Sequence, residues 1–171
     1  VSPRENMDWI FRTCKRYAEV FGPGSGNLLL TGEPGLGKTF LSAAIAREVS
    51  AGGFSVVYDT AVHIFDRFEA RKFGRELGEA VEADVDRVMD CDLLILDDLG
   101  TELTTPFVQS ALYGIVNGRI TDRRATILST NLKLDELARR YTPQIVSRME
   151  GEYQVLPFFG EDIRRLKKER G

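Results

Sequence analysis

The stretch Gly32-Glu33-Pro34-Gly35-Leu36-Gly37-Lys38-Thr39 has the residue types and spacing of a phosphate-binding loop, G-x-x-x-x-G-K-[ST]. Its glycines let backbone N–H groups approach phosphate oxygens without a Cβ in the way. Lys38 is expected to reach the β- and γ-phosphates, and Thr39 to place its hydroxyl on Mg²⁺. The loop and Phe40, which opens the next helix, therefore predict a site for ATP or ADP with Mg²⁺. The alternative is a glycine-rich turn before an ordinary helix.

Two carboxylates, Asp97 and Asp98, follow the apolar run Leu93-Leu94-Ile95-Leu96. Such a run is typical of a central strand covered on both faces, and its carboxyl end lies at the sheet edge where a phosphate loop also sits. Asp97 is expected to bind Mg²⁺ directly or through water, and Asp98 to orient and polarise the attacking water. An acidic turn after a buried strand would look the same, and the phosphate loop favours the catalytic interpretation.

Three later residues are candidates for contacts to the phosphates. Asn131 follows the apolar run 125–129 and is expected to point at the γ-phosphate and the water, although Thr-Asn after a strand is also an ordinary turn. Arg148 is the candidate for stabilising charge on a phosphoryl group bound by a neighbouring subunit, and Arg164 for a contact within the same chain. Most surface arginines are simply solvated, so each of these is weak by itself.

The elements that must position these groups alternate between strand and helix along the chain. This alternation predicts an α/β fold of three α-β-α layers around a central, mostly parallel five-stranded sheet. The expected helices are 5–21, 40–51, two within 60–90 with a break near 74–78, 106–120, 134–141, 143–149 and 161–170, and the expected strands are 27–31, 55–59, 93–96, 125–129 and 153–156.

Composition narrows the classes of protein that remain. A length of 171 residues suggests one domain, and a net charge of −3 excludes a wholly basic nucleic-acid binder, so DNA contacts need a local patch. The two cysteines, Cys14 and Cys91, lie far apart without a neighbouring histidine, which excludes a zinc site of usual spacing and favours reduced thiols in a cytoplasmic protein. No apolar run is long enough for a membrane span. Because the chain opens at Val1 without a start Met, we expect a fragment.

The chain resembles the AAA+ ATPases, and more narrowly the DnaC/DnaI helicase-loader group with its IstB-like transposition relatives. The stretches that carry the resemblance are Ser2–Met7, Gly32–Ser42, Cys91–Glu102, Leu112–Arg119, Ile127–Asn131, Ser147–Met149 and Gly160–Arg164. The resemblance implies a P-loop AAA+ core with little or no lid domain. It also implies one ATPase domain over residues 1–171, from which an N-terminal partner-binding domain is missing.

The resemblance also implies residue roles. Asn131 matches the first sensor, Arg148 the arginine finger that acts in trans, and Arg164 the second sensor. The segment around Asn6 and Met7 is expected near the adenine. Two positions depart from the group's pattern: Asp98 stands where many AAA+ proteins carry Glu, which predicts looser water positioning and slow hydrolysis, and Gln144 stands where related loaders often have a further Arg.

A single-stranded DNA path is the last feature that the family implies, along an extra helix after the second strand. Here that region carries four cations, interleaved with Phe65, Phe68 and Phe73. The cations are Arg67, Arg71, Lys72 and Arg75. Basic groups beside aromatic rings suit backbone contacts and base stacking. A solvated helix whose phenylalanines pack in the core explains the same pattern.

Three functions fit these features. In the first, the protein loads the replicative helicase onto single-stranded DNA, and ATP acts as a switch for self-association. In the second, an IstB-like ATPase assists DNA transposition with the same nucleotide site. In the third, more remote, a small-molecule kinase uses the phosphate loop, but we find no clear acceptor segment for it.

Overall fold

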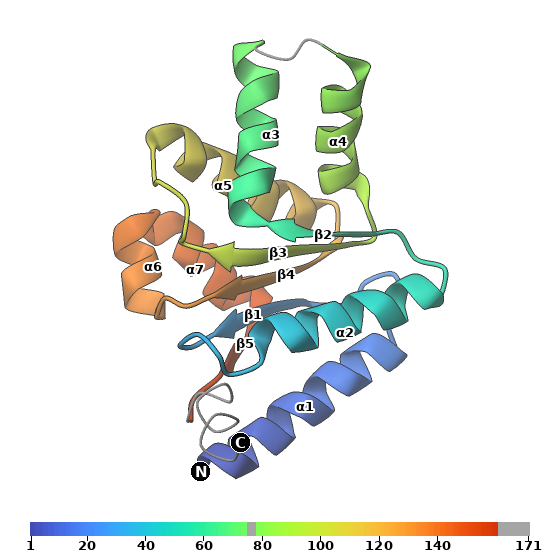
Figure 1. Ribbon diagram of the computed structural model, residues 1–171, viewed down its shortest axis with the longest axis vertical. Coiled ribbons are helices and arrows are strands. Elements are labelled where there is room, and N and C mark those ends of the chain that lie inside the picture. The colour runs from blue at the N-terminus through green and yellow to red at the C-terminus, as the bar shows by residue number, and fades with distance from the viewer. Residues whose placement is uncertain (75–77, 161–171) are drawn as a thin grey trace, which may run out of the picture.

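The computed structural model describes residues 1–74 and 78–160. Helices and strands alternate through most of this part of the chain (Figure 1). The helices are α1 (Pro3–Glu19), α2 (Lys38–Ala51), α3 (Ala61–Phe73), α4 (Glu79–Asp90), α5 (Pro106–Thr121), α6 (Leu134–Arg140) and α7 (Pro143–Glu152). The strands are β1 (Asn27–Thr31), β2 (Val56–Thr60), β3 (Leu93–Leu99), β4 (Ala125–Thr130) and β5 (Tyr153–Pro157).

The five strands form one sheet in the order β2-β3-β4-β1-β5, and every neighbouring pair is parallel. The predicted α/β class and the five-stranded sheet are therefore confirmed. Parallel neighbours need crossover connections, which the helices supply. All strand arrows in Figure 1 run toward the same side, where the loop between β1 and α2 lies.

Helices cover both faces of the sheet because successive strand residues point to opposite sides. Leu28 and Leu30 of β1 pack in a cluster with α1 and α2, whereas Leu29 packs in a second cluster with α3 to α7. In Figure 1 the pair α1 and α2 lies below the sheet, and the α3–α4 hairpin stands above it. The sheet is thus packed between helices on both faces, and its carboxyl edge is left for a site.

Several predicted boundaries move, each for a local reason. The first helix begins at Pro3 and not at Glu5, because Ser2 accepts from the Glu5 N–H and the Glu5 side chain accepts from the Ser2 N–H. It ends at Glu19, before the predicted end at Phe21. The predicted helix 161–170 lies outside the described residues.

One buried cation joins three elements at the amino end of the sheet. Arg119 of α5 is 0% exposed. Its guanidinium donates to the carbonyls of Val88 and Met89 in α4, and also to those of Cys91 and Ala125 and to the Thr126 hydroxyl, at 2.8–2.9 Å. It thus satisfies carbonyls at the carboxyl end of α4, where a positive charge is favourable.

No helix in the described part of the chain is long and apolar enough to cross a lipid bilayer.

Candidate functional site

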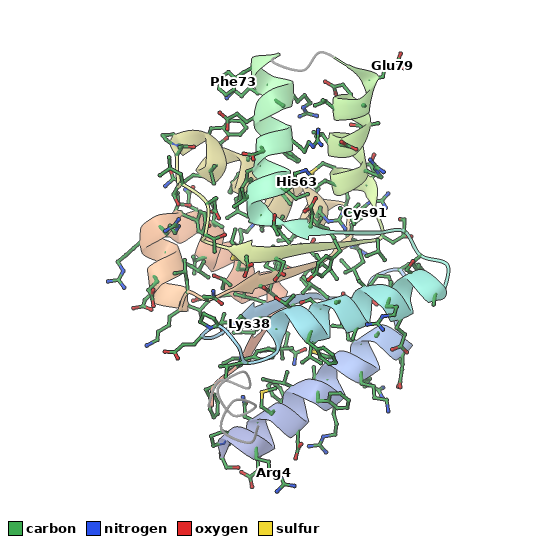
Figure 2. All side chains as sticks on the ribbon, viewed as in Figure 1. Arg4, Lys38, His63, Phe73, Glu79 and Cys91 are labelled. Atoms are coloured by element: carbon green, nitrogen blue, oxygen red, sulfur yellow. The ribbon has the colours of Figure 1, made fainter. Side chains whose placement is uncertain are left out.

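The strand order brings the predicted site residues to one edge of the sheet. β4 lies between β1 and β3, so its end, followed by Asn131, lies between the phosphate loop after β1 and the aspartates of β3. Figure 2 shows Lys38 at this edge, where the chain passes from β1 into α2. The ends of parallel strands at such a crevice are where α/β proteins bind nucleotides.

The phosphate loop has the backbone that its glycines allow. Gly32 has φ +135°, and a Cβ there would come within 2.2 Å of the Phe158 carbonyl oxygen, so only glycine fits. Gly37, also left-handed with φ +101°, is the N-cap of α2 and gives that helix no side-chain cap. The first N–H groups of α2 therefore have no side-chain cap and can donate to an anion, which is the arrangement that binds phosphate at helix N-termini.

Lys38 is buried and turned back across the loop. Its Nζ donates to the carbonyl oxygens of Gly32 and Glu33, the latter at 2.8 Å. The pKa of Lys38 is lowered from its ordinary value, because the effect of burial outweighs the opposing effect of the nearby carboxylates Asp98, Asp97 and Glu33. The ammonium group is thus held at the loop by carbonyls, in reach of the place where phosphate charge would develop.

Asp97 is buried and accepts three hydroxyl donors. Thr39 donates to its Oδ2 at 3.1 Å, Tyr58 to the same oxygen at 3.0 Å, and Ser129 to its Oδ1. The sequence does not single out Tyr58, and it predicts Ser129 only as the last residue of the strand before Asn131. The signal for both is register: Tyr58 pairs with Ile95 and Ser129 follows the β4 residue paired with Leu96.

Asp98 stands in an unusual backbone conformation. Its φ is +53°, and the pairing of β3 with β4 shifts register between Leu96 and Leu99, so the two aspartates lie in a bulge inside β3 and not after it. Asp tolerates the left-handed region better than most residues, and such conformations gather at functional sites. Burial and the Asp97 carboxylate raise the pKa of Asp98, and Lys38 opposes them.

The remaining predicted phosphate contacts are dispersed. Asn131 is half-buried at the end of β4. Arg148 is exposed on α7, where its Nη2 donates to the Asn117 Oδ1 of α5 at 2.6 Å. Arg164 lies outside the described residues. Arg148 is thus exposed, and its guanidinium is held against α5 by Asn117, a bond that a contact to a neighbouring molecule has to share or replace.

The predicted adenine segment lies beside the loop through β5. The Asn6 side chain is buried and donates to the Pro157 carbonyl at 2.7 Å, and the next residue, Phe158, donates its N–H to Thr31 at 2.7 Å. Met7 is half-buried against the α1–α2 cluster. Asn6 therefore fastens α1 to the strand that flanks the phosphate loop.

The candidate DNA residues lie on the α3–α4 hairpin. Arg67 and Arg71 lie 3.9 Å from Asp84 and Glu82 of α4, and Lys72 lies over the rings of Phe73 and Phe107. Phe65 is buried in the core, as expected for a solvated helix whose phenylalanines pack inward. Phe73, in contrast, is 54% exposed near the tip of α3 (Figure 2). Arg75 lies outside the described residues.

The donor set fits Mg²⁺. A threonine hydroxyl and a buried carboxylate are hard oxygen ligands, and this ion is usually held by one or two such protein groups together with phosphates and water. No cluster of three or more His, Cys, Asp or Glu side chains suited to a metal occurs among residues 1–74 and 78–160. The site thus suits an ion that arrives with the nucleotide better than a metal in an all-protein cage.

Fold and site together define a P-loop nucleotide-binding core: a parallel sheet, a phosphate loop, an aspartate pair and polar residues at the end of the intervening strand. The chain belongs to the family described as IstB-like ATP binding protein, whose profile matches residues 19–170. This membership confirms the predicted resemblance and gives no support to the small-molecule kinase.

Curated relatives include two helicase loaders. The replicative helicase loader DnaC of Escherichia coli (strain K12) is 27% identical over 154 residues, which cover 90% of this chain and 62% of DnaC. The replicative helicase loader DnaI of Bacillus subtilis (strain 168) is 33% identical over 136 residues, 75% of this chain and 40% of DnaI. The chain thus spans less than two thirds of the length of either relative.

Among solved structures, the crystal structure of the DnaC helicase loader matches with a TM-score of 0.75 and 22% sequence identity, covering 89% of each chain. At that identity the match shows a shared fold.

Proposed function

We propose that this chain is an ATPase that loads the replicative helicase onto single-stranded DNA, with ATP as a switch for assembly. The observation that carries the ATPase part is the meeting of Lys38, Thr39, Asp97 and Asp98 at the end of β1 and β3. The similarity to DnaC and DnaI supports the loader part. Residues 1–171 act as one AAA+ domain in this proposal.

The loop residues hold ATP or ADP. Backbone N–H groups of Gly32–Phe40 and the Lys38 ammonium bind the phosphates, Thr39 and Asp97 hold Mg²⁺, and Asn6 and Met7 lie on the adenine side. Bound Mg²⁺ would neutralise charge on the phosphate oxygens.

Hydrolysis needs a water in line with the γ-phosphate. Asp98 orients and polarises this water, and Asn131, directly after the strand between the two motifs, contacts the water and the γ-phosphate. Asp98 is one methylene shorter than Glu, so we expect slow hydrolysis that DNA or a partner stimulates.

Self-association completes the site. Arg148 is exposed on α7, far from its own chain's loop in sequence, and reaches the ATP of a neighbouring subunit as an arginine finger. Arg164 contacts the nucleotide within its own chain. ATP therefore favours assembly, and its hydrolysis or release reverses it.

Single-stranded DNA binds along the α3–α4 hairpin in this proposal. Lys72, with the rings of Phe73 and Phe107, offers a cation beside aromatic faces, as backbone contact and base stacking require. Arg67 and Arg71 also face carboxylates of α4. To bind DNA, Arg67 and Arg71 must either give up their ion pairs with these carboxylates or keep them while also contacting a phosphate. Arg75 is the fourth candidate.

An IstB-like helper of DNA transposition is the second candidate, favoured by the family that the chain belongs to. Purified replicative helicase and purified transposase from the same source separate the two. Each is added, with ATP and single-stranded DNA, to a form of the protein that carries the N-terminal partner-binding domain expected from the resemblance, and ATP hydrolysis and co-sedimentation are measured. A response to the helicase alone is expected. A response to the transposase alone would overturn the loader proposal, and Lys38→Ala is the control with weakened nucleotide binding.

A further inference from the structure

An unpredicted hydrogen bond joins the edge of the sheet to the candidate magnesium ligand. Tyr58 lies on β2, the edge strand, and pairs with Ile95 of β3. Its side chain points to the same face of the sheet as Asp97, two residues farther along β3, because side chains alternate along a strand. The long phenol spans this diagonal, and its hydroxyl donates to Asp97 Oδ2 at 3.0 Å.

The donors around Asp97 come from three different elements. Thr39 at the start of α2 and Tyr58 on β2 share Oδ2, and Ser129 on β4 serves Oδ1. Hydroxyl groups orient a carboxylate without forming an ion pair with it, so these donors can hold Asp97 in place and leave it to bind a divalent cation. A Thr39 oxygen on Mg²⁺ can still donate its proton to Asp97, and the Tyr58 bond then fixes the rotation of the same carboxylate.

Packing alone does not call for the hydroxyl of Tyr58. The residue is 37% exposed, and a phenylalanine would fill the same place on the edge strand. Partners that orient metal ligands are commonly needed for metal affinity even though they never touch the metal.

We propose that Tyr58 is a positioning residue that holds Asp97 in the orientation for Mg²⁺ binding. This inference rests on the proposed function, in which Thr39 and Asp97 hold the Mg²⁺ of bound ATP. Tyr58 contacts neither the nucleotide nor the ion in this account, so its effect is confined to the magnesium-dependent part of binding.

The test uses fluorescent N-methylanthraniloyl-ATP with the wild-type chain and with Tyr58→Phe, which keeps the partly exposed ring and is expected to fold. Affinity is measured first in EDTA and then across a Mg²⁺ titration. We expect equal Kd values in EDTA and about a tenfold rise in the half-saturating Mg²⁺ concentration for Tyr58→Phe. Tyr113→Phe, at a 43% exposed tyrosine on α5, is the matched control and should titrate as wild type.

Two results would overturn the inference while leaving the proposed function intact. In the first, the Mg²⁺ titrations of Tyr58→Phe and wild type overlap. In the second, Tyr58→Phe loses as much ATP affinity in EDTA as it does in Mg²⁺, which would assign Tyr58 to binding of the nucleotide itself. Failure of the proposed function looks different, because a wild-type chain whose ATP affinity ignores Mg²⁺ would remove the magnesium site altogether.

Discussion

Replacement of Arg119 by methionine tests how the sheet and the α3–α4 hairpin are held together. The guanidinium makes five hydrogen bonds, four of them to the carbonyls of Val88, Met89, Cys91 and Ala125. Methionine keeps most of the volume and removes every donor. Because Val88 and Met89 close α4, the variant also loosens the base of the hairpin that carries the candidate DNA contacts.

The magnitude follows from the four carbonyls that lose this donor. A buried polar group left unsatisfied costs about 1–3 kcal/mol, which gives roughly 4–12 kcal/mol for four. Removal of a buried charge, which itself costs several kcal/mol, offsets part of this. We expect a net loss of about 3–5 kcal/mol, which lowers the melting temperature by about 6–20 °C for a domain of this size.

Thermal and urea unfolding, followed by circular dichroism, measure this loss. Arg139→Met is the matched control, because Arg139 is exposed and, among residues 1–74 and 78–160, pairs with Asp135 on the same helix at 3.3 Å; it should change stability by less than about 0.5 kcal/mol. A loss below about 1 kcal/mol for Arg119→Met would refute the role assigned to these hydrogen bonds.

Three predictions concern the nucleotide site. Gly32→Ala should lower the free energy of unfolding, measured with urea, by about 1–3 kcal/mol, because the new Cβ would lie 2.2 Å from the Phe158 carbonyl oxygen. An unchanged urea midpoint would contradict this. The control is Gly26→Ala, where a Cβ meets nothing within 4 Å. Lys38→Ala should weaken fluorescent ATP binding roughly 10- to 100-fold through loss of a charge-assisted contact, and equal affinity would argue against the loop. Asp98→Asn should keep ATP affinity and lower hydrolysis by about 10²-fold or more; full hydrolysis would remove Asp98 from the mechanism.

The phosphate loop and the aspartate pair could be predicted from sequence because their signals are local. Gly32, Lys38 and Thr39 stand within a few residues of one another, and Asp97 follows the apolar run Leu93-Leu94-Ile95-Leu96, which is typical of a buried central strand. The fold class follows from the same alternation of apolar strands and helices.

Contacts that depend on strand register could not be predicted. Tyr58 lies 39 residues before Asp97, and its type is ordinary for a strand, so only the pairing of β2 with β3 reveals the contact. Arg119 was equally hidden, because a charged residue late in a helix is usually solvated and its acceptors are main-chain carbonyls without a sequence signature. The start of α1 was readable in Ser2-Pro3-Arg4-Glu5, a capping box.

The central claim, assembly switched by ATP, is tested most directly by the sedimentation mass of the chain. The mass is measured with ADP, and with a non-hydrolysable ATP analogue and single-stranded DNA, for the wild type and for Arg148→Ala. The account predicts a larger complex only with the analogue and DNA, and its loss in Arg148→Ala. A constant monomer mass, or a complex that Arg148→Ala leaves unchanged, would contradict it.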